Sequence, residues 1–139
     1  MSARDALRTG AARLAAAGVE GAADDARILL AHALDLPRER LLQHMGDALS
    51  DKQARRFEAA IAARAARQPV AQITGRRLFH GLPFRVSRET LDPRPETEVL
   101  VAEALREPAF RILDLGTGTG CILLSILKAM PMARGIGID

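Results

Sequence analysis

The stretch Arg111-Ile-Leu-Asp-Leu-Gly-Thr-Gly-Thr-Gly120 predicts the fold of the C-terminal part of the chain. An apolar strand-forming run leads into a glycine-rich turn, and an apolar helix-forming segment follows. A second apolar run, Gly135-Ile-Gly-Ile-Asp139, then ends on an acid. This strand–turn–helix–strand order with an acidic end is typical of an α/β unit that binds a nucleotide-bearing cofactor.

The spacing of the glycines indicates the kind of cofactor. A dinucleotide site requires Gly-x-Gly-x-x-Gly, and its third glycine would fall on Cys121. The glycines stand instead at Gly116, Gly118 and Gly120, and Asp114 precedes them. That acid would repel a diphosphate, but it suits the ammonium and sulfonium of S-adenosylmethionine, while Asp139 suits the ribose hydroxyls. A glycine-rich turn without a ligand and a nicotinamide site are the alternatives.

Composition and charge limit the class of protein. The chain has 139 residues, of which 48% are hydrophobic and 27% charged, so we expect a globular protein. A single cysteine excludes an internal disulfide, and three scattered histidines predict no metal site. No apolar run approaches the ~20 residues that cross a membrane. The N-terminal residues lack the apolar centre of a signal peptide, and we expect a cytoplasmic protein with no membrane partner.

Basic residues are concentrated in one stretch of the chain. Residues 51–88 hold nine basic and two acidic side chains. Such a stretch could face an acidic protein or ribosomal RNA, and a solvated helix face with a charged hairpin is an equally good interpretation. The chain has no Trp or Tyr on which bases could stack, so we expect no direct readout of nucleic acid.

The first seventy residues predict helices. Apolar spacing favours helices over residues 3–17 and 22–34, and Pro37 fits the first turn of a short third helix that carries Leu41 and Leu42. Ser50 and Gln53 form a capping box that opens a fourth helix, which ends near Arg67. We expect a helical bundle over residues 1–73, with no catalytic constellation.

Residues 74–95 predict a β-hairpin and linker. The runs 76–79 and 82–87 flank His80-Gly81, a turn dipeptide. Leu91-Asp-Pro-Arg-Pro-Glu-Thr-Glu98 follows, and its second proline begins a helix through about Leu105. Glu96 and Glu98 suit either a pocket wall or the positive end of the helix dipole. The residues expected to be buried in this helix are Val99, Leu100, Ala102 and Leu105.

Four motifs together resemble the HemK/PrmC family. They are Gln68-Pro-Val-Ala-Gln-Ile-Thr-Gly75, Phe79-His-Gly-Leu-Pro-Phe84, Leu91–Glu98 and Arg111–Gly120, in the family's order. Members of the family methylate the side-chain amide of the glutamine in the Gly-Gly-Gln motif of peptide chain release factors. The resemblance implies an α+β to α/β protein: an N-terminal helical bundle that docks the release factor, a linking hairpin, and a seven-stranded Rossmann-like methyltransferase domain that begins at residue 96.

The resemblance also implies roles for particular residues. Gly116, Thr117, Gly118, Thr119 and Gly120 resemble the loop around the methionine part of S-adenosylmethionine, and Asp139 resembles the acid on its ribose. Phe84, Arg94 and Glu96 fall in segments that the family places beside the cofactor and the target glutamine. Gln72 and Asp92 depart from the family, which often has an aromatic and an aliphatic residue there. No catalytic residue is assigned.

The given residues contain no Asn-Pro-Pro-Tyr motif, and the resemblance implies that this motif, which holds the target amide in the family, follows Asp139. We therefore expect this chain alone to lack methyltransferase activity and to bind the cofactor weakly or not at all. Ile112, Leu113, Ile136 and Ile138 are expected to lack most of their packing partners. Two alternative functions remain open: a methyltransferase for nucleic-acid amino groups, and a non-catalytic helical module that binds a protein. Association of the enzyme with the ribosome is a further expectation.

Overall fold

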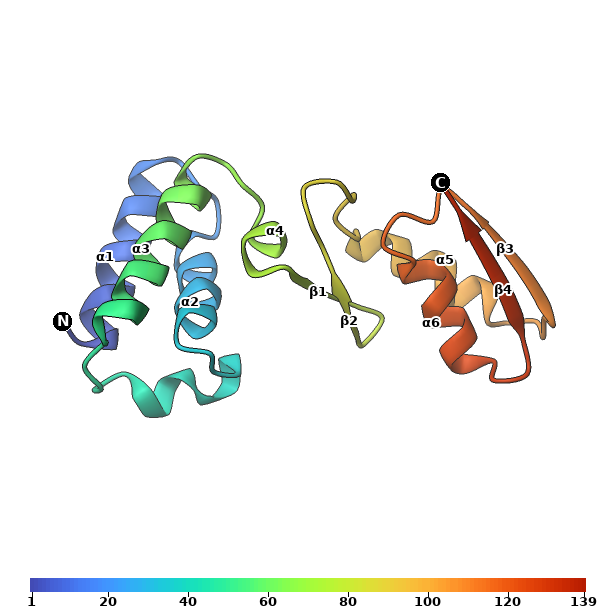
Figure 1. Cartoon of the computed structure of the whole chain (residues 1–139), viewed down its shortest axis with the longest axis horizontal. Coiled ribbons are helices and arrows are strands. Elements are labelled where there is room, and N and C mark those ends of the chain that lie inside the picture. Colours follow the sequence, from blue (N-terminus) through green and yellow to red (C-terminus); the bar gives the residue numbers. More distant parts are fainter. The chain divides into compact units, whose positions relative to one another are not determined.

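The computed structural model describes all 139 residues, which form two compact units, Met1–Thr74 and Gly75–Asp139 (Figure 1). The first unit is helical, and the second combines short helices with two small sheets. None of the helices has both the length and the apolar character needed to span a membrane.

The first unit confirms the expected helical N-terminal part. Its elements are α1 (Ala3–Ala16), α2 (Ala22–Ala33), the 3-10 helix η1 (Arg38–His44), α3 (Asp51–Ala65) and α4 (Val70–Thr74). Helices α1, α2 and α3 contact one another around one apolar core. The buried core residues with the largest side chains are Leu14, Leu29, Leu30, Leu41, Phe57 and Ile61.

Local signals explain where these helices begin. The Ser50 hydroxyl accepts the Gln53 N–H, and Gln53 Oε1 accepts the Ser50 N–H, so the predicted capping box is present. Pro37 is the residue before η1 instead of part of its first turn, with an extended ψ of 143°. Within η1 only Leu41 is buried, and Leu42 is 82% exposed. Helix α4, which the sequence analysis did not predict, begins directly after Pro69.

The second unit begins with the predicted hairpin. Strands β1 (Arg76–Phe79) and β2 (Leu82–Arg85) pair antiparallel, and Phe79 lies opposite Leu82. His80 and Gly81 between them have φ values of +49° and +74°. Positive φ at both turn residues is the geometry of a two-residue type I′ hairpin, and it matches the twist of the strands.

The rest of the second unit contains the predicted strand–helix–strand order. The elements are η2 (Pro95–Thr97), α5 (Glu98–Ala104), β3 (Arg111–Leu115), α6 (Cys121–Ala129) and β4 (Arg134–Ile138). Strands β3 and β4 are parallel, with Leu113 opposite Ile136 and Leu115 opposite Ile138. Helix α6 contacts both strands and α5 (Figure 1). This is one β–α–β unit with parallel strands, the unit from which α/β sheets are built; the seven-stranded Rossmann-like domain that the family resemblance implies remains an expectation.

The prediction of the buried face of α5 was wrong for Val99, Leu100 and Ala102, whereas Leu105 does pack against the core. Val99 and Leu100 are 72% and 55% exposed, and Ala102 is exposed too, whereas Val101 is fully buried. Val101 and the half-buried Leu105 lie one helical turn apart and share a core with Cys121 and Ile126 of α6. The face of α5 that is buried is therefore the one that meets α6.

One face of the β3–β4 sheet is exposed. Leu113, Leu115, Ile136 and Ile138 are 62%, 71%, 66% and 50% exposed. The expectation of missing partners is confirmed for Leu113, Ile136 and Ile138 and was wrong for Ile112. Ile112 points to the opposite face, because side chains alternate along a strand, and it packs against the core of this unit.

Candidate functional site

The glycine turn folds over the end of β4. Gly116, Gly118 and Gly120 have φ values of +73°, +53° and +76°, which disfavour any residue with a side chain. The backbone N–H groups of Gly116 and Thr117 both donate to the carbonyl oxygen of Ile138, at 2.7 and 3.1 Å. Gly120 N–H donates to Thr117 O at 2.8 Å and leads directly into α6. These bonds hold the turn at the carboxyl ends of both parallel strands.

Two carboxylates lie at this edge of the sheet. Asp114 Oδ2 accepts the Thr117 hydroxyl at 2.9 Å, and Asp139 Oδ1 accepts the Gly118 N–H at 2.9 Å. Each carboxylate has a second oxygen for which no bond is recorded. The structure therefore brings together four of the residues selected from the sequence, Asp114, Thr117, Gly118 and Asp139. Gly116, Thr119 and Gly120 belong to the same turn.

Two glycines of β4, which were not selected from the sequence, allow the glycine turn and α6 to approach this strand closely. A Cβ on Gly137 would lie 2.5 Å from Thr117 Oγ1, and one on Gly135 would lie 2.5 Å from Leu123 Cδ1. Real Cβ atoms do not come so near to other heavy atoms, so a side chain at position 137 would displace Thr117, and one at position 135 would displace the end of the Leu123 side chain. The alternation Gly-Ile-Gly-Ile was the available signal, because it places both glycines on one face of the strand.

Phe84 is part of the core of the second unit. Its side chain is 7% exposed and meets Phe79 edge to face, with ring centroids 6.2 Å apart. Both rings belong to the cluster that contains Cys121, the residue after Gly120. Phe84 therefore lies in the same core as the first residue of α6.

Arg94 and Glu96 lie on an exposed segment. Both side chains are exposed, and neither makes a recorded hydrogen bond or ion pair to the glycine turn. The backbone carbonyl of Arg94 accepts the Thr97 N–H at 3.0 Å, which closes the first turn of η2. The structure thus leaves both charged groups open to solvent and apart from the bonded network of Asp114 and Asp139.

Two contacts near this segment were not predicted. Asp92, one of the two departures from the family pattern, forms an ion pair with Arg77 of β1 at 3.3 Å. Glu98 Oε1 accepts the backbone N–H of His80 at 2.7 Å. The role of Glu98 as a first-turn acid is therefore combined with a contact to the hairpin turn.

The basic stretch is largely engaged within the protein. Arg64 forms an ion pair with Asp25 at 2.7 Å, and both side chains are about four-fifths buried. Arg67 donates to the carbonyl oxygens of Ala17 and Gly18, at the end of α1. Further basic residues with an acidic partner are Arg56, with Asp35, and Arg77, with Asp92. These contacts weaken the interpretation of the stretch as a nucleic-acid surface.

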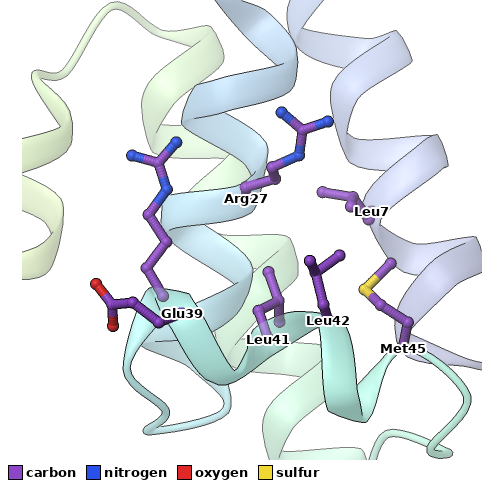
Figure 2. A pocket seen from close by; sticks show the side chains of 7 residues that line it. Leu7, Arg27, Glu39, Leu41, Leu42 and Met45 are labelled. Carbon is purple, nitrogen blue, oxygen red and sulfur yellow. The ribbon is translucent and has the colours of Figure 1, made fainter.

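The first unit has an open pocket of about 470 Å³ (Figure 2). Leu7, Leu41, Leu42 and Met45 give it apolar walls from α1, η1 and the residue after η1. Arg27 and Arg38 also line it, and both pair with Asp24, at 3.6 and 2.6 Å. The remaining lining residue, Glu39, is the only carboxylate in the wall. No group of three or more His, Cys, Asp or Glu side chains in the chain could hold a metal ion.

Known proteins resemble the chain in sequence over its whole length. Residues 5–75 match the family model of the PrmC N-terminal domain. The chain is 60% identical over its whole length to a release factor glutamine methyltransferase of Cereibacter sphaeroides, and it covers 50% of that protein. Proteins with the same name from Rhodospirillum rubrum and Bradyrhizobium diazoefficiens are each 45% identical; 96% and 99% of this chain aligns to 42% and 49% of theirs.

The chain thus spans about half the length of the curated relatives it matches. The family model covers just over half of the chain, and the relatives extend the similarity through the glycine turn to Asp139. The chain belongs to the PrmC family.

Proposed function

We propose that the protein containing these residues uses S-adenosylmethionine to methylate the side-chain amide nitrogen of the glutamine in the Gly-Gly-Gln motif of peptide chain release factors. The observation that carries this proposal is the pair of carboxylates, Asp114 and Asp139, bonded to one glycine turn at the carboxyl ends of two parallel strands. Ligands of α/β sheets bind at this end of the strands. The names of the relatives support methyl transfer to a release factor.

The residues present fit this cofactor. Apart from the glycine and its two chain neighbours, no residue has an atom within 4 Å of the position that a Cβ would take on Gly116 or Gly118, so there is open space above the turn. The second oxygen of Asp114 is proposed to accept a hydrogen bond from the ammonium group of the methionine part. The second oxygen of Asp139 is proposed to accept hydrogen bonds from the ribose hydroxyls. Thr117, Thr119 and Gly120 shape the loop between the two acids.

The chain's contribution to the reaction is binding and orientation. Bound S-adenosylmethionine supplies a methyl carbon activated by the positive sulfur. An amide nitrogen is a weak nucleophile because its lone pair is delocalised into the carbonyl, so holding both partners in line is the main task. Orientation of this kind lowers a barrier by roughly 7–11 kcal/mol. We assign no general base in this chain, and the segments that contain Phe84, Arg94 and Glu96 are proposed to lie beside the substrates.

The proposed division of labour follows the sequence. In this proposal, residues 1–73 dock the release factor and residues 96–139 begin the methyltransferase domain. Residues 74–95 link these two parts. The apolar walls of the pocket lined by Leu7, Leu42 and Met45 support a protein-binding role for the first part. A cytoplasmic location, with access to release factors at the ribosome, completes the proposal.

The test is a methyl-transfer assay with the methyltransferase that contains these residues. We expect transfer to a release factor, and none to a release factor whose Gly-Gly-Gln glutamine is replaced by alanine. Asp139→Ala should raise KM for S-adenosylmethionine, while Asp47→Ala, a change to an exposed acid in the first unit, should leave it unchanged. Transfer to RNA but not to release factor would favour the nucleic-acid alternative, and docking without transfer to any substrate would favour the non-catalytic module.

A further inference from the structure

The segment Asp92–Glu98 is attached to the hairpin at both of its ends. At its start, Asp92 Oδ2 lies 3.3 Å from Arg77 Nη1 on β1. At its end, Glu98 Oε1 accepts the backbone N–H of His80 at 2.7 Å, at the tip of the same hairpin. Two polar contacts therefore fix one short segment to one hairpin.

The contact of Glu98 satisfies a donor that the hairpin itself does not use. Strand pairing ends at Phe79 and Leu82, and His80 follows with a φ of +49°. The N–H group of the first residue in a two-residue turn has no partner across the strands, so that of His80 is free to bond elsewhere. A carboxylate is a strong acceptor for it, and the short distance is that of a charge-assisted hydrogen bond.

The contact of Asp92 is partly shielded from solvent. The Asp92 and Arg77 side chains are 24% and 33% exposed, and Asp92 Oδ1 is buried without a partner. A carboxylate in that position depends on its remaining contact, because an uncompensated charge away from water is unfavourable. Pro93, the next residue, is buried and holds the backbone there.

At the centre of the segment between the two contacts lie Arg94, Pro95 and Glu96. All three are exposed, and the side chains of Arg94 and Glu96 have no recorded bond within the protein. Pro93 and Pro95 restrict the backbone on either side of Arg94. The structure thus presents two charged side chains on a short segment that is stiff and attached at both ends.

We propose that Asp92 and Glu98 are positioning residues, which hold Arg94 and Glu96 in place for contact with the protein substrate. This inference rests on the proposed function, because that function assigns Arg94 and Glu96 to the substrate side. Neither Asp92 nor Glu98 touches the reacting groups in this proposal. Each acts through the segment between them.

The first measurement is hydrogen exchange at residues 91–98 and at the His80 amide, in the 139-residue chain. Glu98→Ala should speed exchange at both by about tenfold, since it removes a hydrogen bond to a charged group. Glu98→Gln keeps an oxygen acceptor and should restore most of the protection. Glu103→Ala is the matched control, because Glu103 lies on the same helix and pairs only with Arg106. Unchanged exchange in Glu98→Ala would overturn the attachment, and circular dichroism checks that each variant is folded.

The second measurement is methyl transfer to release factor by the methyltransferase that contains these residues. Glu98→Ala and Asp92→Ala should each lower kcat/KM for the release factor by about tenfold or more, as misplaced contacts do. The KM for S-adenosylmethionine should stay unchanged, and Glu98→Gln should recover most of the activity. Faster exchange with unchanged kcat/KM would overturn the positioning role. If the unaltered enzyme does not methylate release factor at all, the proposed function fails and the substrate role with it, while the exchange result still decides on the attachment.

Discussion

Gly137 determines how closely the glycine turn can approach β4. A Cβ at this position would lie 2.5 Å from Thr117 Oγ1 and 2.8 Å from Thr117 Cβ. Gly137→Ala should therefore push Thr117 away from Asp114 and cost about 1–3 kcal/mol, as overpacking does. Gly46→Ala is the control, because no atom lies within 4 Å of its added Cβ. Urea unfolding followed by circular dichroism measures both, and equal midpoints for the two variants would contradict the prediction.

Asp35 should make the stability of the first unit depend on pH. Its carboxylate accepts two bonds from Arg56, at 2.6 and 3.1 Å, and the hydrogen bond from Arg56 lowers the pKa of Asp35. A pKa that is lower in the folded state stabilises the fold above the unfolded pKa of about 3.9, and this contribution is lost as the pH falls through the folded value.

Asp35→Asn tests this dependence, because Asn tolerates the φ of +54° at this position and removes the charge. We expect a lower urea midpoint than that of the unaltered chain at neutral pH. The difference should disappear at a pH below the folded pKa of Asp35. Glu20→Gln, which changes an exposed acid without a recorded partner, should behave like the unaltered chain at both pH values. A difference that persists in acid would point to a cause other than the charge of Asp35.

At the scale of the element, the capping box should control the stability of α3. Ser50 Oγ accepts the Gln53 N–H at 3.3 Å, and this helix brings Phe57 and Ile61 into the core. Ser50→Ala should cost about 1 kcal/mol, whereas Ser50→Thr keeps the hydroxyl and should cost less. Thermal unfolding followed by circular dichroism distinguishes them. Equal losses in the two variants would mean that the hydroxyl has no capping role.

The elements that could be predicted are those whose signals lie within a few residues. The capping box at Ser50, the hairpin at His80-Gly81 and the turn after Leu115 each depend on neighbours in sequence. The buried face of α5 could not be predicted, because α6, a later segment, determines that Val101 and not Val99 is buried. Periodicity in so short a helix does not distinguish these faces.

The candidate site shows the same limit. The spacing of the glycines and of the two acids predicted a common turn, and the bonds from Thr117 to Asp114 and from Gly118 to Asp139 agree with it. The need for glycine at position 137 depends on contact with Thr117, which only the folded β3–β4 pair creates. The bond from His80 to Glu98 uses a backbone donor, which every residue except proline carries, so no residue type could signal it.

At the scale of the whole molecule, the two cores draw on separate parts of the chain. Every member of the first core lies within residues 1–74, and every member of the second within residues 79–130. Residues 1–74 should therefore fold alone, with a cooperative thermal transition, although a domain of this size has limited stability. Circular dichroism of that fragment tests the prediction, and Phe57→Ala should abolish the transition. A gradual, non-cooperative loss of helix in the unaltered fragment would contradict it.

The exposure of the glycine turn determines what the 139-residue chain can bind. Ligand sites usually bury about 70–90% of a ligand's surface, whereas Gly116, Gly118 and Asp139 are all exposed at the edge of a two-stranded sheet. Isothermal titration calorimetry of the chain with S-adenosylmethionine should therefore give a dissociation constant weaker than about 100 μM, which is less than about 5.5 kcal/mol of binding free energy. Micromolar binding would contradict this prediction and would mean that the exposed glycine turn is sufficient to bind the cofactor.

The same titration with NAD separates the two classes of cofactor at this turn. Asp114 lies within hydrogen-bonding distance of Thr117, so its negative charge faces the loop that would have to receive a diphosphate. Asp114→Asn removes that charge and should weaken any residual binding of S-adenosylmethionine while leaving NAD unbound or slightly favoured. Tighter binding of NAD than of S-adenosylmethionine by the unaltered chain would contradict the assignment of the cofactor, because it would require the loop to accept a diphosphate beside an ionised acid.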